Sequence, residues 1–248
     1  MTPKEQLKAL APEVKKFIQA QYSTYNRSLL PALKKAGVKV VEKHEDLTED
    51  QQAFVDQYFE EAVYPVLTPM AMDSARPFPL VRNKTLNIGA LIAKKGKKDK
   101  EELEFATVQV PSVLPRIIEI PGDKKDKTTV VLLEEIIERN IGKLFLSNTV
   151  VCTCPYRIIR NADLTIDEDE AADLLTEIEK QLKKRQWGEV IRLDVEEKMD
   201  PRLLKILKME FDMKEEDIHY INGPLDLTFL MKMYKLEGFD DLKVPPYT

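Results

Sequence analysis

Apolar and polar positions follow a helical spacing in the first part of the chain and a strand-like spacing after residue 64. In the first block, apolar residues recur every three or four positions, the spacing of one helix face. They are Leu7, Leu10, Val14, Phe17, Ile18, Tyr22 and Tyr25. We therefore predict a helix over 2–36, begun by a Thr2–Glu5 capping box and ended by Gly37.

A short strand over 38–41 and a second helix over 48–63 are predicted next. Thr48 and Gln51 have the spacing of another capping box, which marks where the second helix begins. Two helices joined by a short connection are expected to pack as a helical hairpin. Because such a pair covers only one seam, we expect apolar surface within 1–63 to need a further partner.

A proline-rich segment separates this helical part from the rest of the chain. Four prolines fall within residues 65–79. Proline fixes its own φ angle and restricts the residue before it, so we predict a stiff, extended connection.

The remaining pattern alternates between strand and helix signals. Predicted strands cover 86–93, 103–110, 117–120, 149–159 and 190–195, and predicted helices cover 132–140, 167–187, 201–211 and 226–235. A charged loop over 94–102 should join the first two strands as a hairpin. Helices followed by a mixed region predict an α+β fold: an N-terminal helical hairpin, then a mixed, mainly antiparallel β-sheet with packed helices.

Charge and hydropathy disfavour two classes of protein, nucleic-acid-binding modules and membrane-spanning proteins. The chain has 38 basic and 43 acidic residues, for a net charge of −5, so it lacks the basic excess typical of nucleic-acid-binding modules. No apolar run is long enough for a transmembrane segment, and the N-terminus lacks a signal-peptide core. We therefore expect a cytoplasmic protein.

Residue types that commonly carry catalysis are few. Glycine-rich phosphate loops and the metalloprotease and serine-hydrolase motifs are absent from the sequence. His44 and His219 have no nucleophile or metal-ligand partner at useful spacing, and Cys152 and Cys154 are too close along a strand for an ordinary disulfide. Acidic clusters fall mostly in first helical turns, where capping explains them. We predict no catalytic residue and no metal site.

One basic stretch suggests anion binding. Arg76 lies in the proline-rich segment, and Arg82 and Lys84 follow shortly after it. An arginine on a stiff backbone is preorganised for phosphate, so these three side chains are candidate anion ligands. The alternative is a structural arginine that donates hydrogen bonds to backbone carbonyls.

Residues 64–79, YPVLTPMAMDSARPFP, resemble the polyphosphate kinase family, whose members phosphorylate their own histidine. Further segments resemble motifs of that family in the same order. They are 83–87, 110–116, 157–164, 188–193 and 223–228. At the position of Arg76 the family often has histidine, so the resemblance assigns no strict role to that side chain.

The resemblance implies a domain organisation. Residues 1–63 would be the end of the family's N-terminal helical domain and 64–248 its head domain, with the catalytic C-terminal domains absent. The phosphate-accepting histidine and the residues that bind magnesium and ATP would belong to those absent parts. No cofactor is therefore expected in this part, although Mg and ATP are implied for the parent enzyme.

The resemblance also implies a function. The parent enzyme would transfer the γ-phosphate of ATP reversibly to polyphosphate through a phosphohistidine. This part, inactive alone, would serve dimer contact in a homo-oligomer and shape the channel for polyphosphate. An alternative is a free-standing module that binds polyphosphate or anionic lipid head groups. Its basic face would have to come from the lysine runs at 94–100 and 124–127, where acids are interleaved. An independent enzyme is disfavoured by the missing motifs.

Overall fold

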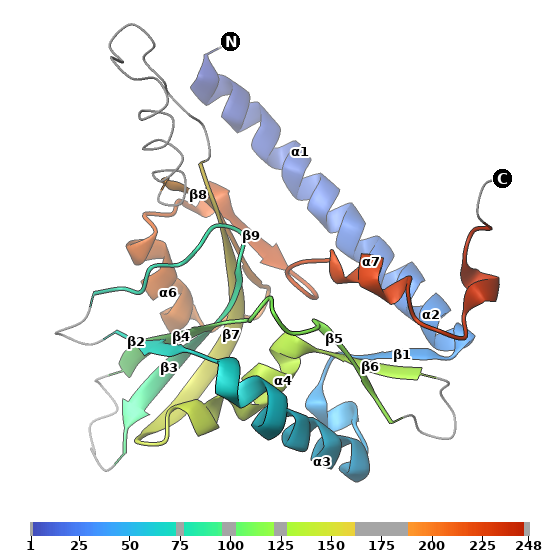
Figure 1. The fold of residues 1–248 in the computed structure, drawn as a ribbon. Coiled ribbons are helices and arrows are strands. Elements are labelled where there is room, and N and C mark those ends of the chain that lie inside the picture. The colour runs from blue at the N-terminus through green and yellow to red at the C-terminus, as the bar shows by residue number, and fades with distance from the viewer. Residues whose placement is uncertain (1, 73–76, 96–102, 122–127, 162–187, 246–248) are drawn as a thin grey trace, which may run out of the picture.

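The computed structural model describes residues 2–72, 77–95, 103–121, 128–161 and 188–245 (Figure 1). Two β-sheets with packed helices make up this part of the chain, and most of the strand pairs are antiparallel. The predicted α+β class is confirmed. No helix among these residues is long and apolar enough to cross a lipid bilayer.

The first predicted helix is present with its predicted caps. Helix α1 (Pro3–Thr24) begins at a Thr2–Glu5 capping box, continues through a π-helical segment (Tyr25–Leu29) and ends as α2 (Leu30–Ala36). Gly37 follows with a φ of 95°, the left-handed conformation that glycine adopts without strain. The π-helical segment ends at Leu29, two residues before Pro31, which cannot donate a backbone hydrogen bond.

The smaller sheet contains one strand that the pattern did not predict. Strand β1 (Val38–Val41) pairs in parallel with β6 (Thr128–Leu132), and β6 pairs antiparallel with β5 (Ile117–Ile120). Strands β1 and β5 were predicted and β6 was not. Its apolar run continues directly into helix α4 (Leu133–Asn140), and a short apolar run cannot be distinguished from the start of a buried helix by periodicity.

The two N-terminal helices do not pack together as the predicted hairpin. Helix α3 (Glu49–Tyr58) begins at the predicted Thr48–Gln51 capping box and continues into a π-helical segment (Phe59–Val63). It packs against α4 and β5 instead, with Val55 and Phe59 in the same core as residues of α4. The reason is that β1, which lies between the two helices in the sequence, pairs with β6 and so becomes part of the smaller sheet.

The larger sheet has six strands in the order β2-β4-β3-β7-β8-β9. Their bounds are Pro69–Ala71 (β2), Leu86–Lys94 (β3), Leu103–Gln109 (β4), Asn148–Arg160 (β7), Val190–Glu196 (β8) and Ile218–Ile221 (β9). All neighbours are antiparallel except β8 and β9. The predicted β3–β4 pairing is confirmed, and the helix predicted over 167–187 lies outside the described residues.

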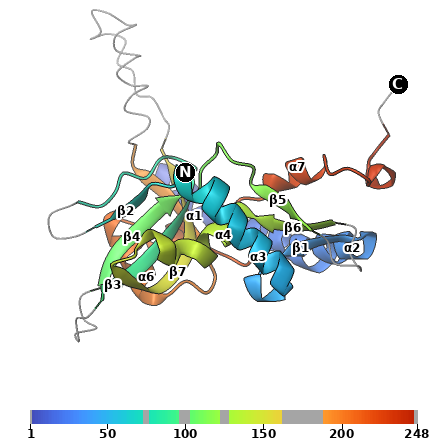
Figure 2. The same ribbon diagram turned by 60° about the horizontal axis from the view of Figure 1, so that its bottom comes forward.

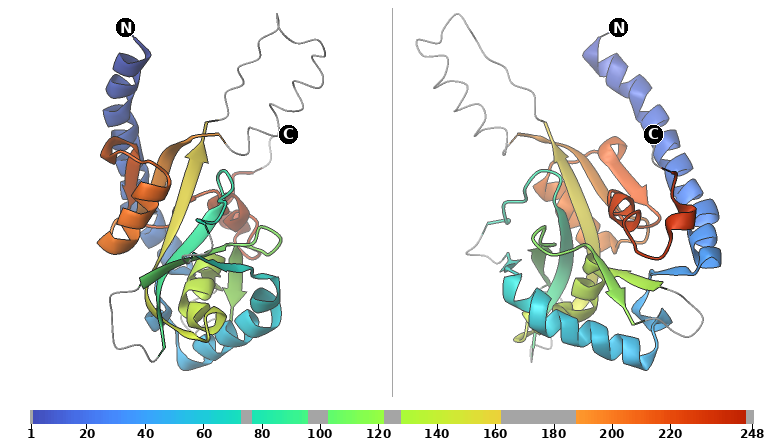
Figure 3. Two further views of the ribbon diagram at one scale, coloured as in Figure 1. Left: turned by 90° about the vertical axis from the view of Figure 1, so that its left-hand side faces the viewer. Right: turned by 45° about the vertical axis from the view of Figure 1, so that its right-hand side comes forward.

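Each face of the larger sheet contributes to a separate core. On one face, Ile88 and Ile92 of β3 join Tyr25, Phe59 and the apolar side of α4. On the other, Leu91 of β3 packs with residues of β4, β7 and helix α6 (Pro201–Glu210). Figures 2 and 3 show α6 and the α3–α4 pair placed around this sheet, with the short helix α7 (Phe229–Met233) near the smaller sheet.

The predicted boundary between residues 63 and 64 stays a prediction. Tyr64–Val66 form a short 3-10 turn, and β2 follows as a short edge strand pairing with β4. Residues from both sides of the boundary share the first core.

Candidate anion-binding surface

Two of the three candidate anion ligands lie in one turn that leads into β3. The turn, residues 82–85, is fixed to β7 because the backbone N–H of Lys84 donates to the carbonyl of Ile158 at 2.9 Å. Lys84 has a φ of 61°, and the Thr85 hydroxyl donates to the Arg82 carbonyl at 2.9 Å. The side chains of Arg82 and Lys84 are exposed. Arg76, the third candidate, lies outside the described residues.

Two arginines from the end of β7 hold this turn in place. The Arg160 guanidinium donates to the carbonyl of Val81 at 3.2 and 3.0 Å and to the carbonyl of Gly188 at 2.8 Å. Its backbone N–H donates to Asn83 Oδ1 at 2.9 Å. Arg157 Nε donates to the Lys84 carbonyl at 3.3 Å. Arg157 and Arg160 thus act as structural arginines that donate hydrogen bonds to backbone carbonyls.

We call Arg82, Lys84, Arg157 and Arg160 the basic turn. The first two are exposed, and the ion pairs described between residues of this structure include neither of them. Carbonyl acceptors orient Arg157 and Arg160 but do not neutralise their charge. The arrangement presents four positive charges around one short turn, which suits an extended anion.

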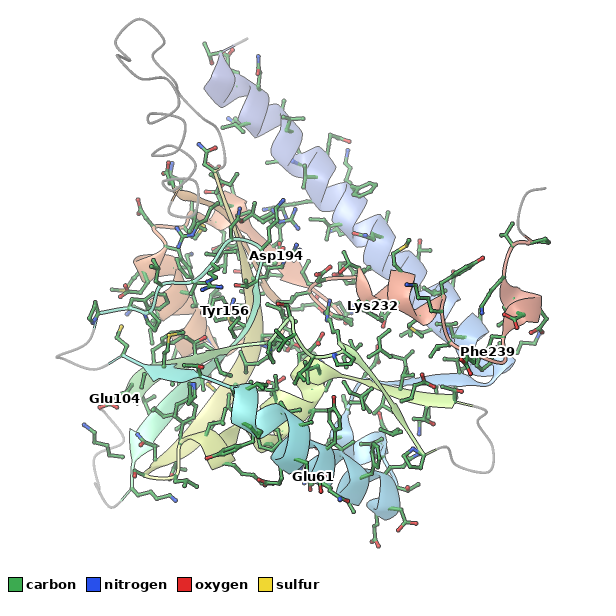
Figure 4. The ribbon with its side chains drawn as sticks, viewed as in Figure 1. Glu61, Glu104, Tyr156, Asp194, Lys232 and Phe239 are labelled. Atoms are coloured by element: carbon green, nitrogen blue, oxygen red, sulfur yellow. The ribbon has the colours of Figure 1, made fainter. Side chains whose placement is uncertain are left out.

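One buried acid lies close to the basic turn. Asp194 of β8 is opposite Arg157 in the strand register and forms an ion pair with Arg192, whose Nε lies 2.6 Å from Oδ1. Figure 4 labels Asp194 on the side of the sheet nearest α1. Burial raises the pKa of this carboxyl, and the Arg192 hydrogen bond and charge oppose that shift. Arg157 also lowers the pKa of Asp194 by its charge, and it acts in the same way on Asp226, so these two acids offset part of the positive charge of the basic turn.

Sequence reasoning proposed Arg82 and Lys84 as candidates, and it did not anticipate that Arg157 and Arg160 hold the same turn. The sequence signals were that Arg157 lies near the end of a predicted strand, that Arg160 follows it directly, and that both fall in the family-like segment 157–164. Their role depends on the register between β3 and β7, which places Leu86 opposite Arg157. The pattern also missed a group of three acids, Glu135, Glu138 and Glu196, which come together only in the folded chain.

The histidines lie apart from the basic turn. His44 is half-buried in a 3-10 turn (His44–Asp46), and its pKa is lowered by burial and by the charge of Arg139. His219 is buried on β9, where burial and the charges of Arg192 and Lys15 lower its pKa to about 4. Both side chains are therefore mainly neutral at pH 7.

The two cysteines contact the same core, as their spacing on a strand predicted. Cys154 is buried in the second core and Cys152 packs against it half-buried, and both are free thiols. Burial raises the pKa of each thiol, so neither is an activated nucleophile.

Comparison with known proteins identifies the family. The family model described as "Polyphosphate kinase middle domain" matches residues 50–233. The chain belongs to the polyphosphate kinase family. It is 44% identical over its whole length to the polyphosphate kinase of Lactiplantibacillus plantarum and 43% identical over 95% of its length to that of Bacillus anthracis. The resemblance read from the sequence motifs is thereby confirmed.

The same comparisons bear on chain length and fold. This chain spans 34% of the length of each of those two relatives, so it corresponds to a fragment of them. The crystal structure of polyphosphate kinase from Porphyromonas gingivalis superposes with a TM-score of 0.78 at 20% identity, covering 99% of this chain and 34% of that one. At this identity the superposition shows a shared fold.

Proposed function

We propose that this chain is the non-catalytic N-terminal and head portion of a polyphosphate kinase. The parent enzyme would transfer the γ-phosphate of ATP reversibly to polyphosphate through a phosphohistidine. Family membership and the coverage of about a third of the curated relatives support this assignment. Phosphate transfer, with its Mg and ATP, is assigned to the parts of the relatives that this chain does not span.

The observation that carries the proposed role is the basic turn. Polyphosphate has a negative charge at every phosphate, and proteins that neutralise such a chain gain affinity by releasing counterions. Exposed Arg82 and Lys84, on a turn held by Arg157 and Arg160, offer this interaction without a large reorganisation. The head portion would therefore form one side of the channel along which polyphosphate runs.

Dimer contact is the second proposed role. The N-terminal half of α1 extends away from the sheets (Figure 1) and exposes apolar side chains that would suit a subunit contact in a homo-oligomer. The catalytic domains of the same polypeptide would be further partners, and the assembled enzyme would act in the cytoplasm.

Binding of end-labelled polyphosphate to this chain, followed by fluorescence anisotropy, tests the role of the basic turn. The double variant Arg82→Gln/Lys84→Gln is expected to bind about tenfold more weakly, with a shallower dependence of affinity on salt. A matched control, Lys232→Gln/Lys235→Gln, changes two exposed lysines at the end of α7, one of which Figure 4 labels. Equal binding by both double variants would refute the role of the basic turn.

A second arm of the same experiment distinguishes the polyphosphate kinase head from the alternative, a free-standing module that binds anionic surfaces. Vesicles containing phosphatidylserine present negative head groups without a polyphosphate chain. A polyphosphate kinase head is expected to bind polyphosphate more tightly than these vesicles at equal ionic strength. Tighter binding to the vesicles, lost in the Arg82→Gln/Lys84→Gln variant, would favour the lipid-binding module.

A further inference from the structure

A cavity of about 320 Å³ lies where the two sheets meet. Its wall includes residues of β1, α4, the end of β8 and the loop after β9. Five acids line it, and three of these form one group: Glu135 and Glu138 from consecutive turns of α4, and Glu196 from the last position of β8.

The three carboxyl groups lie close together. One oxygen of each lies within 4.8 Å of the others, and all three side chains are half-buried. The Thr153 hydroxyl donates to Glu138 at 2.6 Å, and the Cys154 thiol lies 3.7 Å from Glu196 Oε2. The ion pairs between described residues include none of these acids. Lys43 and Lys198 also line the cavity, with exposed side chains.

Charge repulsion makes this grouping costly when the acids are ionised, unless a proton or a metal cation joins them. Burial is the largest cause that raises the pKa of each acid, and neighbouring acids raise it further. Nearby carboxylates in a poorly solvated site destabilise one another as anions. A cation between them would remove that repulsion.

A tyrosine in the same wall supplies a second, independent observation. Tyr25 is 2% exposed, and its hydroxyl has no hydrogen-bond partner in the described part of the chain. The nearby acids whose charges act most strongly on this hydroxyl are Glu42, another residue of the cavity wall, and Glu134, the neighbour of Glu135. A buried hydroxyl without a partner is unfavourable, and its position on this wall suits a hydrogen bond with a water molecule held by a cation.

We propose that Glu135, Glu138 and Glu196 bind one hard divalent cation, with Tyr25 accepting a hydrogen bond from one of its water ligands. Carboxylate and water oxygens are the ligands that such ions prefer. Ca²⁺ has ligands at about 2.3–2.6 Å, so oxygens up to about 4.8 Å apart can share its coordination shell. Mg²⁺, at about 2.0–2.1 Å, would draw them closer. This site departs from the sequence-based expectation of no metal.

The site would have a structural role beyond the proposed contact with polyphosphate. Helix α4 follows β6 of the smaller sheet directly, whereas Glu196 ends β8 in the larger one. A cation held by both elements would fasten the two sheets together at their junction. Its effect should therefore be visible in stability, independently of polyphosphate.

Titration of the metal-free chain with Mn²⁺, followed by the electron paramagnetic resonance of the free ion, tests the site directly. We expect one Mn²⁺ per chain, displaced by Mg²⁺ or Ca²⁺. Glu138→Gln and Glu196→Gln should each weaken binding at least about tenfold, the size of effect expected for lost metal contacts. The control, Glu119→Gln, changes an exposed acid on β5 and should leave the affinity unchanged.

Thermal unfolding distinguishes a metal site from an acid cluster that only affects folding. Mn²⁺ should raise the Tm of the wild-type chain by mass action. Glu135→Gln, which removes repulsion while preserving shape, should raise the Tm without metal and reduce the increase that Mn²⁺ causes. The proposal is overturned if the wild-type chain binds no Mn²⁺ at millimolar concentration, or if Glu138→Gln and Glu196→Gln bind it as wild type does.

Discussion

Arg116 connects three parts of the chain through a single side chain. Its Nε lies 3.1 Å from both carboxylate oxygens of Glu134 on α4, and its Nη1 donates to the backbone carbonyl of Asp226. The guanidinium also lies 5.3 Å from the centre of the Phe229 ring. Only 14% of the Arg116 side chain and 4% of the Glu134 side chain are exposed, so this ion pair is largely desolvated.

Loss of Arg116 should therefore lower the free energy of unfolding. Arg116→Met would leave Glu134 buried without its cation, and breaking a buried pair in this way costs about 3–5 kcal/mol of unfolding free energy. The measurement is urea unfolding of the variant and the wild type. Lys16→Met, which removes an exposed pair with Glu13, is the matched control and should change stability by less than about 1 kcal/mol.

A double variant tests the physical reason. If the cost comes from the uncompensated acid, Arg116→Met/Glu134→Gln should recover part of the stability, and the two changes should be strongly non-additive. Additive losses would mean that Arg116 acts through packing alone.

The lowered pKa of His219 predicts that the stability of the chain depends on pH. Lys15 of α1, Arg192 of β8 and the register partner Asp194 surround it, and its folded pKa is about 4 against an ordinary value of 6.5. The folded chain thus resists protonation, while the unfolded chain accepts the proton below pH 6.5. The contribution of His219 to stability is complete above pH 6.5 and is lost as the pH falls toward 4.

His219→Gln should flatten this part of the stability profile. We expect the loss of unfolding free energy between pH 6.5 and pH 4 to be smaller in the variant by on the order of 2 kcal/mol. Chemical unfolding at a series of pH values measures it, and subtracting the two profiles cancels the carboxyl groups that titrate in the same range. Parallel profiles would show that His219 takes up its proton over the same pH range in the folded and unfolded chains, and the prediction would be wrong.

At the scale of elements, the first half of α1 exposes apolar side chains, as the sequence pattern predicted for residues 1–63. Leu7, Leu10 and Phe17 are 69%, 56% and 71% exposed, whereas Ile18 and Tyr22 farther along are buried. The expectation of uncovered apolar surface within 1–63 thus holds for the first half of α1. It fails for α3, where Val55 and Phe59 are buried against the sheet.

We predict that the chain self-associates through this exposed stripe. Exposed apolar patches of this kind commonly mark protein–protein contacts. Sedimentation equilibrium should show association that depends on concentration, and Leu10→Asp/Phe17→Asp should make the chain monomeric. Gln19→Asp adds a charge to an exposed polar position of the same helix and should leave association unchanged. A wild-type chain that is monomeric at high concentration would contradict the prediction.

Local chemistry explains which elements could be predicted from sequence. The starts of α1 and α3 were found because both capping boxes are contiguous signals, and Gly37 marked the end of α2 in the same way. Strand β6 was missed because its run of apolar residues continues without a break into α4. The predicted helical hairpin was wrong because β1 pairs with β6, which is far from it in the sequence. Sequence spacing does not reveal such pairings.

The same limit applies to the candidate sites. Arg82 and Lys84 could be proposed together as candidates because they are close in sequence. Arg157 and Arg160 reach the same turn only through the register of β3 with β7. Glu135 and Glu138 share one face of α4 by their spacing, but Glu196 comes from another sheet.

At the scale of the whole molecule, we expect the described residues to form no phosphate-transfer centre. His219 is buried beside Arg192, and the Nε2 atom of His44 is buried without a partner in the described part of the chain. An imidazole that accepts a phosphoryl group must be approached in line by the donor phosphate, with cations to hold it. We expect neither environment to offer that access.

We therefore predict that the chain alone does not phosphorylate itself. Incubation with Mg-ATP labelled at the γ-phosphate should give no acid-labile, alkali-stable label, the signature of a phosphohistidine. His44→Gln and His219→Gln serve as matched controls, since any background label should be the same in them as in the wild type. Stoichiometric label that disappears in one of these variants would show that the chain contains a phosphate acceptor of its own. The assignment of phosphate transfer to parts of the enzyme outside these residues would then be wrong.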